Sequence, residues 1–149
     1  MLGTLNDAEI EALLHSEVIG RIGCHDGGRT YVVPITYAYD GEAVYAHSAE
    51  GLKLTMMRNN PEVCFEVEHM DDLASWRSVI AWGRFEQLAG DEAQRGMQRL
   101  LERLRPLMVS ATARPSHGLG AQHRADVQGH TPAVYRIRLR ERTGRFERR

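Results

Sequence analysis

Alternation of apolar and polar positions predicts six β-strands in this chain. The clearest strand covers residues 62–68, where Val63, Phe65 and Val67 share one face and the other face is polar or charged. The predicted strands span residues 18–25, 30–39, 43–47, 62–68, 76–88 and 134–139. Asp-Gly turns separate the first three strands, which predicts that they form an antiparallel meander.

Apolar residues at helical spacing predict three helices. The first begins after Asn6, which can cap it, and ends near Ser16. The second covers residues 52–59, with Leu52 facing inward, and the third covers residues 91–104. Mostly antiparallel strands without strand–helix alternation indicate a mainly β fold with helices (α+β), in the form of a small barrel.

Several positions inside the predicted strands should shape the sheet. Pro34 lacks a backbone N–H, so its strand should have an edge or a bulge there. Gly83 marks a bend or a close backbone approach. The last strand carries Arg136, Arg138 and Arg140 on one face. This face is either a solvated edge of the sheet or a surface that binds an anion or a partner.

Residues 105–132 interrupt the regular pattern with three prolines, three glycines and three histidines. A long irregular segment in a small domain is usually functional, so this one is predicted to be a loop that controls access to a site. His117, His123 and His130 do not have the spacing of helical metal ligands, so no metal site is predicted. Residues 143–149 are predicted to be a basic tail.

Length and charge exclude several classes of function. The 149 residues form one domain, 1–149, and a net charge of −1 gives no field that would attract nucleic acid or a membrane surface. With neither a signal peptide nor a long apolar run, a cytoplasmic protein is predicted. The sequence lacks P-loop, zinc-enzyme and serine-hydrolase motifs. Cys24 and Cys64 fit neither a metal pair nor a disulfide framework.

Lys53 is the single lysine among 19 basic residues. It follows Gly51 at a junction of strand, turn and helix, where free backbone N–H groups and the helix dipole favour an anion. A compact ammonium group suits a phosphate at such a place. The junction therefore predicts a phosphate site.

Five short segments occur in a recognisable order. They read VIGRIG (18–23), YVVPITY (31–37), DGEAVYAHSAEGLK (40–53), RNNPEVCF (58–65) and WRSVIAWG (76–83). Together they resemble the pyridoxamine 5′-phosphate oxidase-like group of FMN-binding proteins, especially its short flavin-nucleotide-binding and nitroimidazole-reductase-like branch. The resemblance implies a six-stranded antiparallel split β-barrel and a homodimer whose interface holds two FMN molecules.

The resemblance also implies a set of flavin contacts. They fall on Val33, Pro34, Ile35, Thr36 and Tyr37, on Ala46, His47 and Ser48, on Lys53 as the phosphate lysine, and on Arg77, Ser78 and Val79. An apolar slot for the ring is expected from Pro34, Ile35, Val79 and Trp82. His47 is the candidate catalytic residue, as a proton donor or acceptor.

Val32 and Leu52 stand where the true oxidases carry arginine, so pyridoxamine oxidation is not expected. Two functions remain open. One is an FMN-dependent oxidoreductase that reduces a small electron-poor substrate. The other is a non-catalytic binding protein or carrier for flavin, deazaflavin or haem.

Overall fold

The structure is a computed structural model that describes residues 1–108 and 132–149. The strands are β1 (Leu2–Thr4), β2 (Ile19–Asp26), β3 (Arg29–Thr36), β4 (Ala38–Tyr39), β5 (Ala43–Ser48), β6 (Glu62–Asp72), β7 (Ser75–Gln87) and β8 (Ala133–Glu147). The helices are α1 (Asp7–Ser16), α2 (Leu52–Asn59), α3 (Gly90–Leu104) and the 3-10 helix η1 (Arg105–Leu107). The histidines at 117, 123 and 130, and most of the predicted loop, lie outside the described residues.

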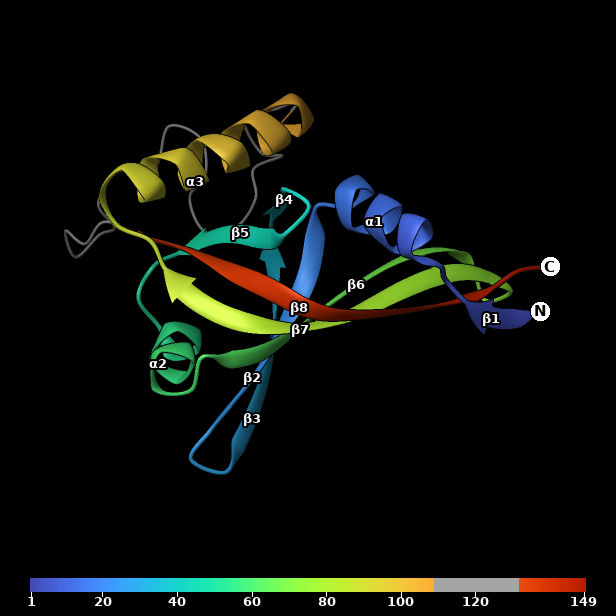
Figure 1. The fold of residues 1–149 in the computed structure, drawn as a ribbon, viewed down its shortest axis with the longest axis horizontal. Helices are drawn as coiled ribbons and strands as arrows, with labels where there is room; N and C mark the ends of the chain where they lie inside the picture. The colour runs from blue at the N-terminus through green and yellow to red at the C-terminus, as the bar shows by residue number, and fades with distance from the viewer. Residues whose placement is uncertain (109–131) are drawn as a thin grey trace.

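All described strands belong to one antiparallel sheet with the order β3-β2-β6-β7-β8-β5-β4, and β1 pairs with β8. β3 and β4 lie at opposite ends of this order, yet Tyr37 alone separates them in the chain. The sheet therefore curls until its two ends meet at Tyr37 (Figure 1). The predicted meander is confirmed in a broken form, because the second predicted strand pairs with β2 through β3 and with β5 through β4.

Two backbone expectations are confirmed. Pro34 lies on β3, which pairs only with β2 in the described residues and is therefore an edge strand. At Gly83 the register between β7 and β8 shifts, and an added Cβ atom would lie 2.3 Å from the carbonyl oxygen of Arg138. Glycine is required there because the two backbones approach too closely for any side chain.

Two sequence predictions are wrong at the ends of strands. The strands predicted over 62–68 and 76–88 approach each other more closely in the structure: β6 extends to Asp72 and β7 begins at Ser75, since each strand supplies the other's hydrogen-bond partners. The predicted basic tail is the end of β8, which pairs with β7 and β1 as far as Glu147.

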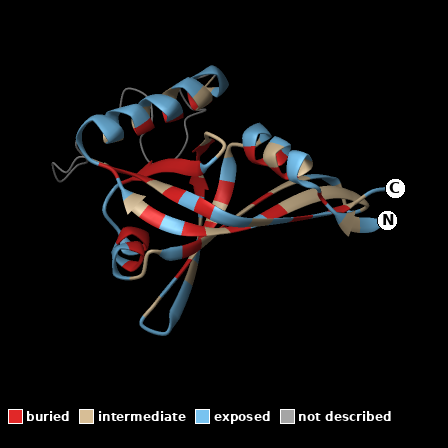
Figure 2. Cartoon of the chain, viewed as in Figure 1, coloured by how far each residue is buried: buried red, intermediate tan, exposed pale blue. Residues whose placement is uncertain are grey.

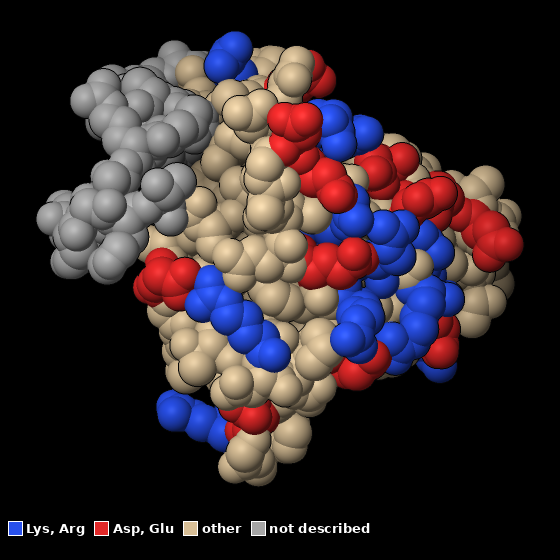
Figure 3. Space-filling model, turned by 60° about the vertical axis from the view of Figure 1, so that its left-hand side comes forward, with Lys and Arg blue, Asp and Glu red and all other residues tan. Residues whose placement is uncertain are grey.

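The solvated-edge interpretation of the three arginines of β8 is also wrong, because this strand lies between β7 and β5. Each arginine forms ion pairs with acidic residues of other elements. These pairs join Arg138 Nε to Glu86 at 2.8 Å, Arg136 to Glu86 and Glu92 at 3.3 Å, and Arg140 to Glu62. Basic and acidic side chains also stand next to one another over the surface in Figure 3.

Buried residues line the inside of the curled sheet, and a second group lies under α3 (Figure 2). Inside the barrel the rings of Tyr37 and Phe65 meet edge to face, with centroids 4.9 Å apart. On the other side of β5 and β8, Leu100 of α3 packs with Tyr45 and Val134. β5 is therefore buried on both faces.

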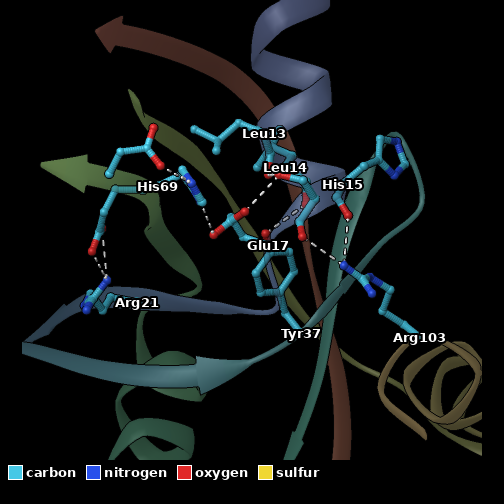
Figure 4. A network of polar contacts seen from close by, with 11 residues as sticks. Leu13, Leu14, His15, Glu17, Arg21, Tyr37, His69 and Arg103 are labelled. Carbon is cyan, nitrogen blue, oxygen red and sulfur yellow. Dashed lines mark hydrogen bonds and ion pairs between the residues drawn. The ribbon is translucent and has the colours of Figure 1, made fainter. Parts of the chain in front are cut away.

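The C-terminal end of α1 joins several parts of the fold (Figure 4). Tyr37 Oη donates a hydrogen bond of 2.8 Å to the carbonyl of Leu14, and Arg103 of α3 donates one of 3.0 Å to the carbonyl of Ser16. Just after the helix, Glu17 contacts His69 of β6 at 3.3 Å. The hydrogen bonds from Tyr37 and Arg103 satisfy carbonyl groups that a helix end leaves without partners.

The structure tests one prediction for the start of α1 and one for the start of α2. The cap at Asn6 is confirmed: its side chain accepts a hydrogen bond from the N–H of Glu9, and Glu9 accepts one from Asn6 in return. In α2 the prediction that Leu52 faces inward is wrong, because Leu52 is 41% exposed, whereas Lys53 and Leu54 are buried.

Candidate functional site

Lys53 is 8% exposed and lies on the buried face of α2. No carboxylate of the described residues forms an ion pair with it, and the ionisable neighbour that acts on its pKa is the thiol of Cys24. Burial lowers the pKa of Lys53, because a desolvated ammonium group is less stable than a neutral amine. A bound anion would offset that cost.

The start of α2 adjoins this lysine and is open to a ligand. The cap residue Gly51 gives no side-chain hydrogen bond, so the first N–H groups of the helix keep their donor capacity. Residues 49–52 are exposed. Ser48 precedes them, and its Oγ atom is buried without a hydrogen-bond partner in the described part of the chain. A cation, free amides and a hydroxyl group are the donors that a phosphate requires, so this end of α2 fits a phosphate.

Two arginines that could serve the same task are already engaged. Arg58 forms two hydrogen bonds of 2.7 Å with the carboxylate of Glu50, and its Nε donates to Gln87. Arg21 contacts both carboxylate oxygens of Glu68, at 2.8 and 2.9 Å. Lys53 is therefore the cation that this region leaves available.

The predicted contacts on β3 alternate between the two faces of the strand. Ile35 and Tyr37 are buried inside the barrel, and Val33 packs against the same core. Pro34 and Thr36 are on the outer face, where Pro34 is exposed. Val79 is buried in the core as well, so the four residues predicted to form an apolar slot do not share one face.

The predicted contacts on β5 lie at its C-terminal end. Ala46 belongs to the barrel core, and Ser48 lies on the same face two residues later. His47 is buried and lies on the opposite face of the strand, opposite Val134 in the ladder with β8. His47 therefore points toward the α3 side of β5, while Ser48 points toward the barrel interior.

Arg77, Ser78 and Val79 lie near the other end of the sheet. They pair with residues 144–146 of β8 close to the chain termini, whereas α2 adjoins the opposite end of β7 (Figure 1). Arg77 lines a pocket of about 290 Å³ together with His69, Trp76 and Glu147. Within one copy of the chain these three residues do not come together with Lys53.

A more apolar groove of about 300 Å³ lies on the outer face of β2, β3, β6 and β7. Val32, Cys64 and Trp82 form its central row, and Gly23 completes the row without a side chain. Val32 is 64% exposed. Sequence reasoning missed Val32 and Cys64 as site residues, although strand alternation already placed both on an outward face.

Next to this groove, Glu66 and Glu68 share hydrogen bonds with each other and with Arg21. Burial and the neighbouring Glu68 raise the pKa of Glu66 to about 7. The hydrogen bond from Glu66 lowers the pKa of Glu68. The pair therefore holds one proton below about pH 7 and releases it as the pH rises through that value.

Replacing Glu66 with glutamine should stabilise the protein at pH 8 by about 1–2 kcal/mol, a value reduced for partial solvent exposure. The folded-state pKa of Glu66 lies above its ordinary value of 4.5, so its stabilising proton is fully bound below pH 4.5 and is lost as the pH rises through about 7. Urea unfolding at pH 5 and pH 8 would measure the difference.

The matched control for this change is Glu68→Gln, which removes the main carboxylate partner of Arg21 and should destabilise the protein at pH 8. If Glu66→Gln kept the wild-type loss of stability between pH 5 and pH 8, the proton would not reside on Glu66.

No helix of the described residues is both long and apolar enough to cross a membrane. The same residues contain no cluster of three or more histidine, cysteine or acidic side chains that could hold a metal ion.

Comparison with known proteins gives three informative similarities. A FAD-binding protein of Mesorhizobium loti superposes with a TM-score of 0.79 at 26% identity, covering 100% of this chain and 98% of the other. A 5-nitroimidazole antibiotic resistance protein of Bacteroides thetaiotaomicron superposes with a TM-score of 0.70 at 19% identity, covering 98% and 89%. An uncharacterised protein of Rhizobium meliloti is 32% identical over 80 residues, which are 54% of this chain and 53% of that protein.

The chain thus spans about half the length of this curated relative. The structural neighbours confirm the predicted split-barrel fold, mainly β with helices, although the sheet formed by residues 1–108 and 132–149 has eight strands and not six. A family model described as pyridoxamine 5′-phosphate oxidase matches residues 6–146. The chain therefore belongs to the pyridoxamine 5′-phosphate oxidase family.

Proposed function

We propose that this protein binds a flavin nucleotide, FMN or FAD, and uses it to reduce small electron-poor organic molecules. The observation that carries the proposal is the buried Lys53 without a carboxylate partner in the described residues, beside the uncapped start of α2. Family membership supports it, as does the similar FAD-binding protein of Mesorhizobium loti.

In this proposal each part of the chain has a separate task. A bound flavin supplies the hydride chemistry. Lys53 and the first amides of α2 hold its phosphate. The outer face of the sheet offers apolar surface at Val32, Ile80 and Trp82, which a second copy of the chain would cover to form a homodimer. That arrangement would also bring Arg77–Val79 of one copy toward the flavin held by the other.

His47 remains the predicted proton donor or acceptor. Its ring is 5% exposed and lies on the α3 side of β5. Proton transfer from this position would need a substrate to approach from the α3 side, so the role of His47 is a prediction for the dimer with substrate bound.

A non-catalytic flavin carrier is the second candidate. Arg58 and Arg21 are engaged by acidic partners, which leaves one cation for the phosphate and favours weaker, reversible binding. A carrier would release its flavin intact and show no turnover.

The two candidates separate in one series of measurements. The protein is incubated with FMN or FAD, freed from unbound flavin, and its absorption spectrum is recorded. The oxidoreductase proposal expects a flavin spectrum that NADH or NADPH bleaches and a nitroimidazole restores over many cycles. A bound flavin without turnover would favour the carrier. A protein that stays colourless with both flavins would contradict both candidate functions. A deazaflavin or haem spectrum from the purified protein would show that this group, and not a flavin, is the cofactor.

A further inference from the structure

A pocket of about 220 Å³ lies between α3 and the strands β5 and β8, away from α2. Its lining consists of Tyr45, Glu92, Arg95, Gly96, Arg99 and Arg136. Neither the family resemblance nor the proposed flavin site uses these residues. Flavin binding therefore does not explain this pocket.

Gly96 explains why α3 comes so close to the sheet at this point. An added Cβ atom would lie 3.1 Å from Leu88 and Val134 and 3.3 Å from the ring of Tyr45. Because the helix rests directly on Tyr45, the side chains of Arg95 and Arg99 extend over the same stretch of β5. Their spacing of four residues places them next to each other on the helix surface.

Arg95 and Arg99 differ from their arginine neighbours on β8. Arg136 forms ion pairs with Glu86 and Glu92, and Arg138 with Glu86 and Glu42. Within the described residues, neither Arg95 nor Arg99 forms an ion pair. Glu92, the carboxylate in the lining, lies at 3.3 Å from Arg136.

The guanidinium of Arg99 lies over the ring of Tyr45, 5.4 Å from its centroid. The Tyr45 hydroxyl in turn donates to Asp40 at 3.1 Å, which fixes the ring. The carboxylate of Asp40 acts electrostatically on Arg99 and offsets part of its charge, so the repulsion of two like charges at this helical spacing is only partly relieved. A dianion between the two guanidinium groups would remove the remaining repulsion and accept hydrogen bonds from both.

We propose that this pocket binds a phosphate-sized dianion through Arg95 and Arg99. Pockets for whole organic ligands usually measure roughly 300–1,000 Å³. At about 220 Å³ this pocket suits free phosphate, or the phosphate group of a ligand whose remainder stays in solvent. The site is separate from Lys53, so the two can be tested independently.

Calorimetric titration with inorganic phosphate, at constant ionic strength set by chloride, tests the site. The wild-type protein should bind phosphate saturably, and sulfate should compete. The double variant Arg95→Gln/Arg99→Gln should bind at least tenfold more weakly. Arg105→Gln, which removes an exposed charge just after α3, is the matched control and should bind as the wild type does.

A third variant, Lys53→Met, distinguishes this site from the proposed flavin site. It should keep the phosphate affinity that depends on Arg95 and Arg99, even where its flavin affinity falls. Circular dichroism would confirm that each variant is folded. Saturable binding by Lys53→Met that is unchanged when Arg95→Gln/Arg99→Gln is added to it, or no saturable binding in the wild type, would overturn the proposal.

Discussion

Gly83→Ala should lower the free energy of unfolding by about 3 kcal/mol or more, the upper range for overpacking. The new methyl group would meet the carbonyl oxygen of Arg138 at 2.3 Å and its carbonyl carbon at 2.9 Å. These are backbone atoms of the paired strand, so no side-chain rotation relieves the contact. Urea denaturation followed by circular dichroism would measure the change.

Gly51→Ala is the matched control for this substitution. Its backbone is extended, with φ of 179°, and an added Cβ atom meets nothing within 4 Å. Alanine is a poorer cap than glycine, so a loss of up to about 1 kcal/mol is expected. Equal losses at the two positions would show that the approach of β7 to β8 at Gly83 is looser than described.

Lys53→Met should weaken flavin binding by about 1.5–3 kcal/mol, the value of a hydrogen bond to a charged group. This corresponds to roughly a 10- to 150-fold higher dissociation constant. Methionine retains most of the buried aliphatic volume, and it removes an ammonium group whose burial already lowers its pKa. The protein without flavin should therefore remain at least as stable as the wild type. Fluorescence titration with FMN and with FAD would give the affinities.

Arg29→Gln serves as the control for lost positive charge, because Arg29 is exposed at the β2–β3 turn. It should leave flavin affinity within about twofold at physiological salt, where screening limits distant charges. A dissociation constant that Lys53→Met does not change would remove Lys53 from the phosphate site. The proposal would then lose its main support, whatever the result of the Arg95 and Arg99 experiment.

Local chemistry made several features predictable from the sequence. Pro34 required an edge because it lacks a donor, and Asn6 with Glu9 specified a helix start through reciprocal hydrogen bonds. Gly83 indicated a close backbone contact. In each case the chemistry of the residue itself restricts the local backbone, so the feature can be predicted without knowing which strands lie next to it.

Other features depend on partners that lie far away in the sequence. The end of β8 continues beyond the predicted strand because β7 and β1 pair with it. The break at Tyr37 does not appear in the side-chain pattern. It arises because the backbone before Tyr37 pairs with β2, whereas the backbone after it pairs with β5.

The candidate site shows the same limit. Lys53 was recognised from its rarity and its place after Gly51, but its burial depends on how α2 rotates against β2. Leu52 and Lys53 are adjacent, so helical spacing alone could not decide which of them faces inward. The pocket of Arg95 and Arg99 was not predicted either. It forms only where α3 packs on β5, and these two elements are far apart in the sequence, so no local pattern indicates it.

The one-residue link at Tyr37 has a mechanical consequence. Both margins of the sheet are joined there, and the hydroxyl of the same residue is anchored to α1. A local opening that separates β3 from β2 would also displace β4 and the C-terminal end of α1. Neither edge of the sheet can therefore open alone. Hydrogen exchange of the backbone amides of β3 and β4 should accordingly be correlated. The amide protons of both strands should stay protected until the two edges of the sheet open together.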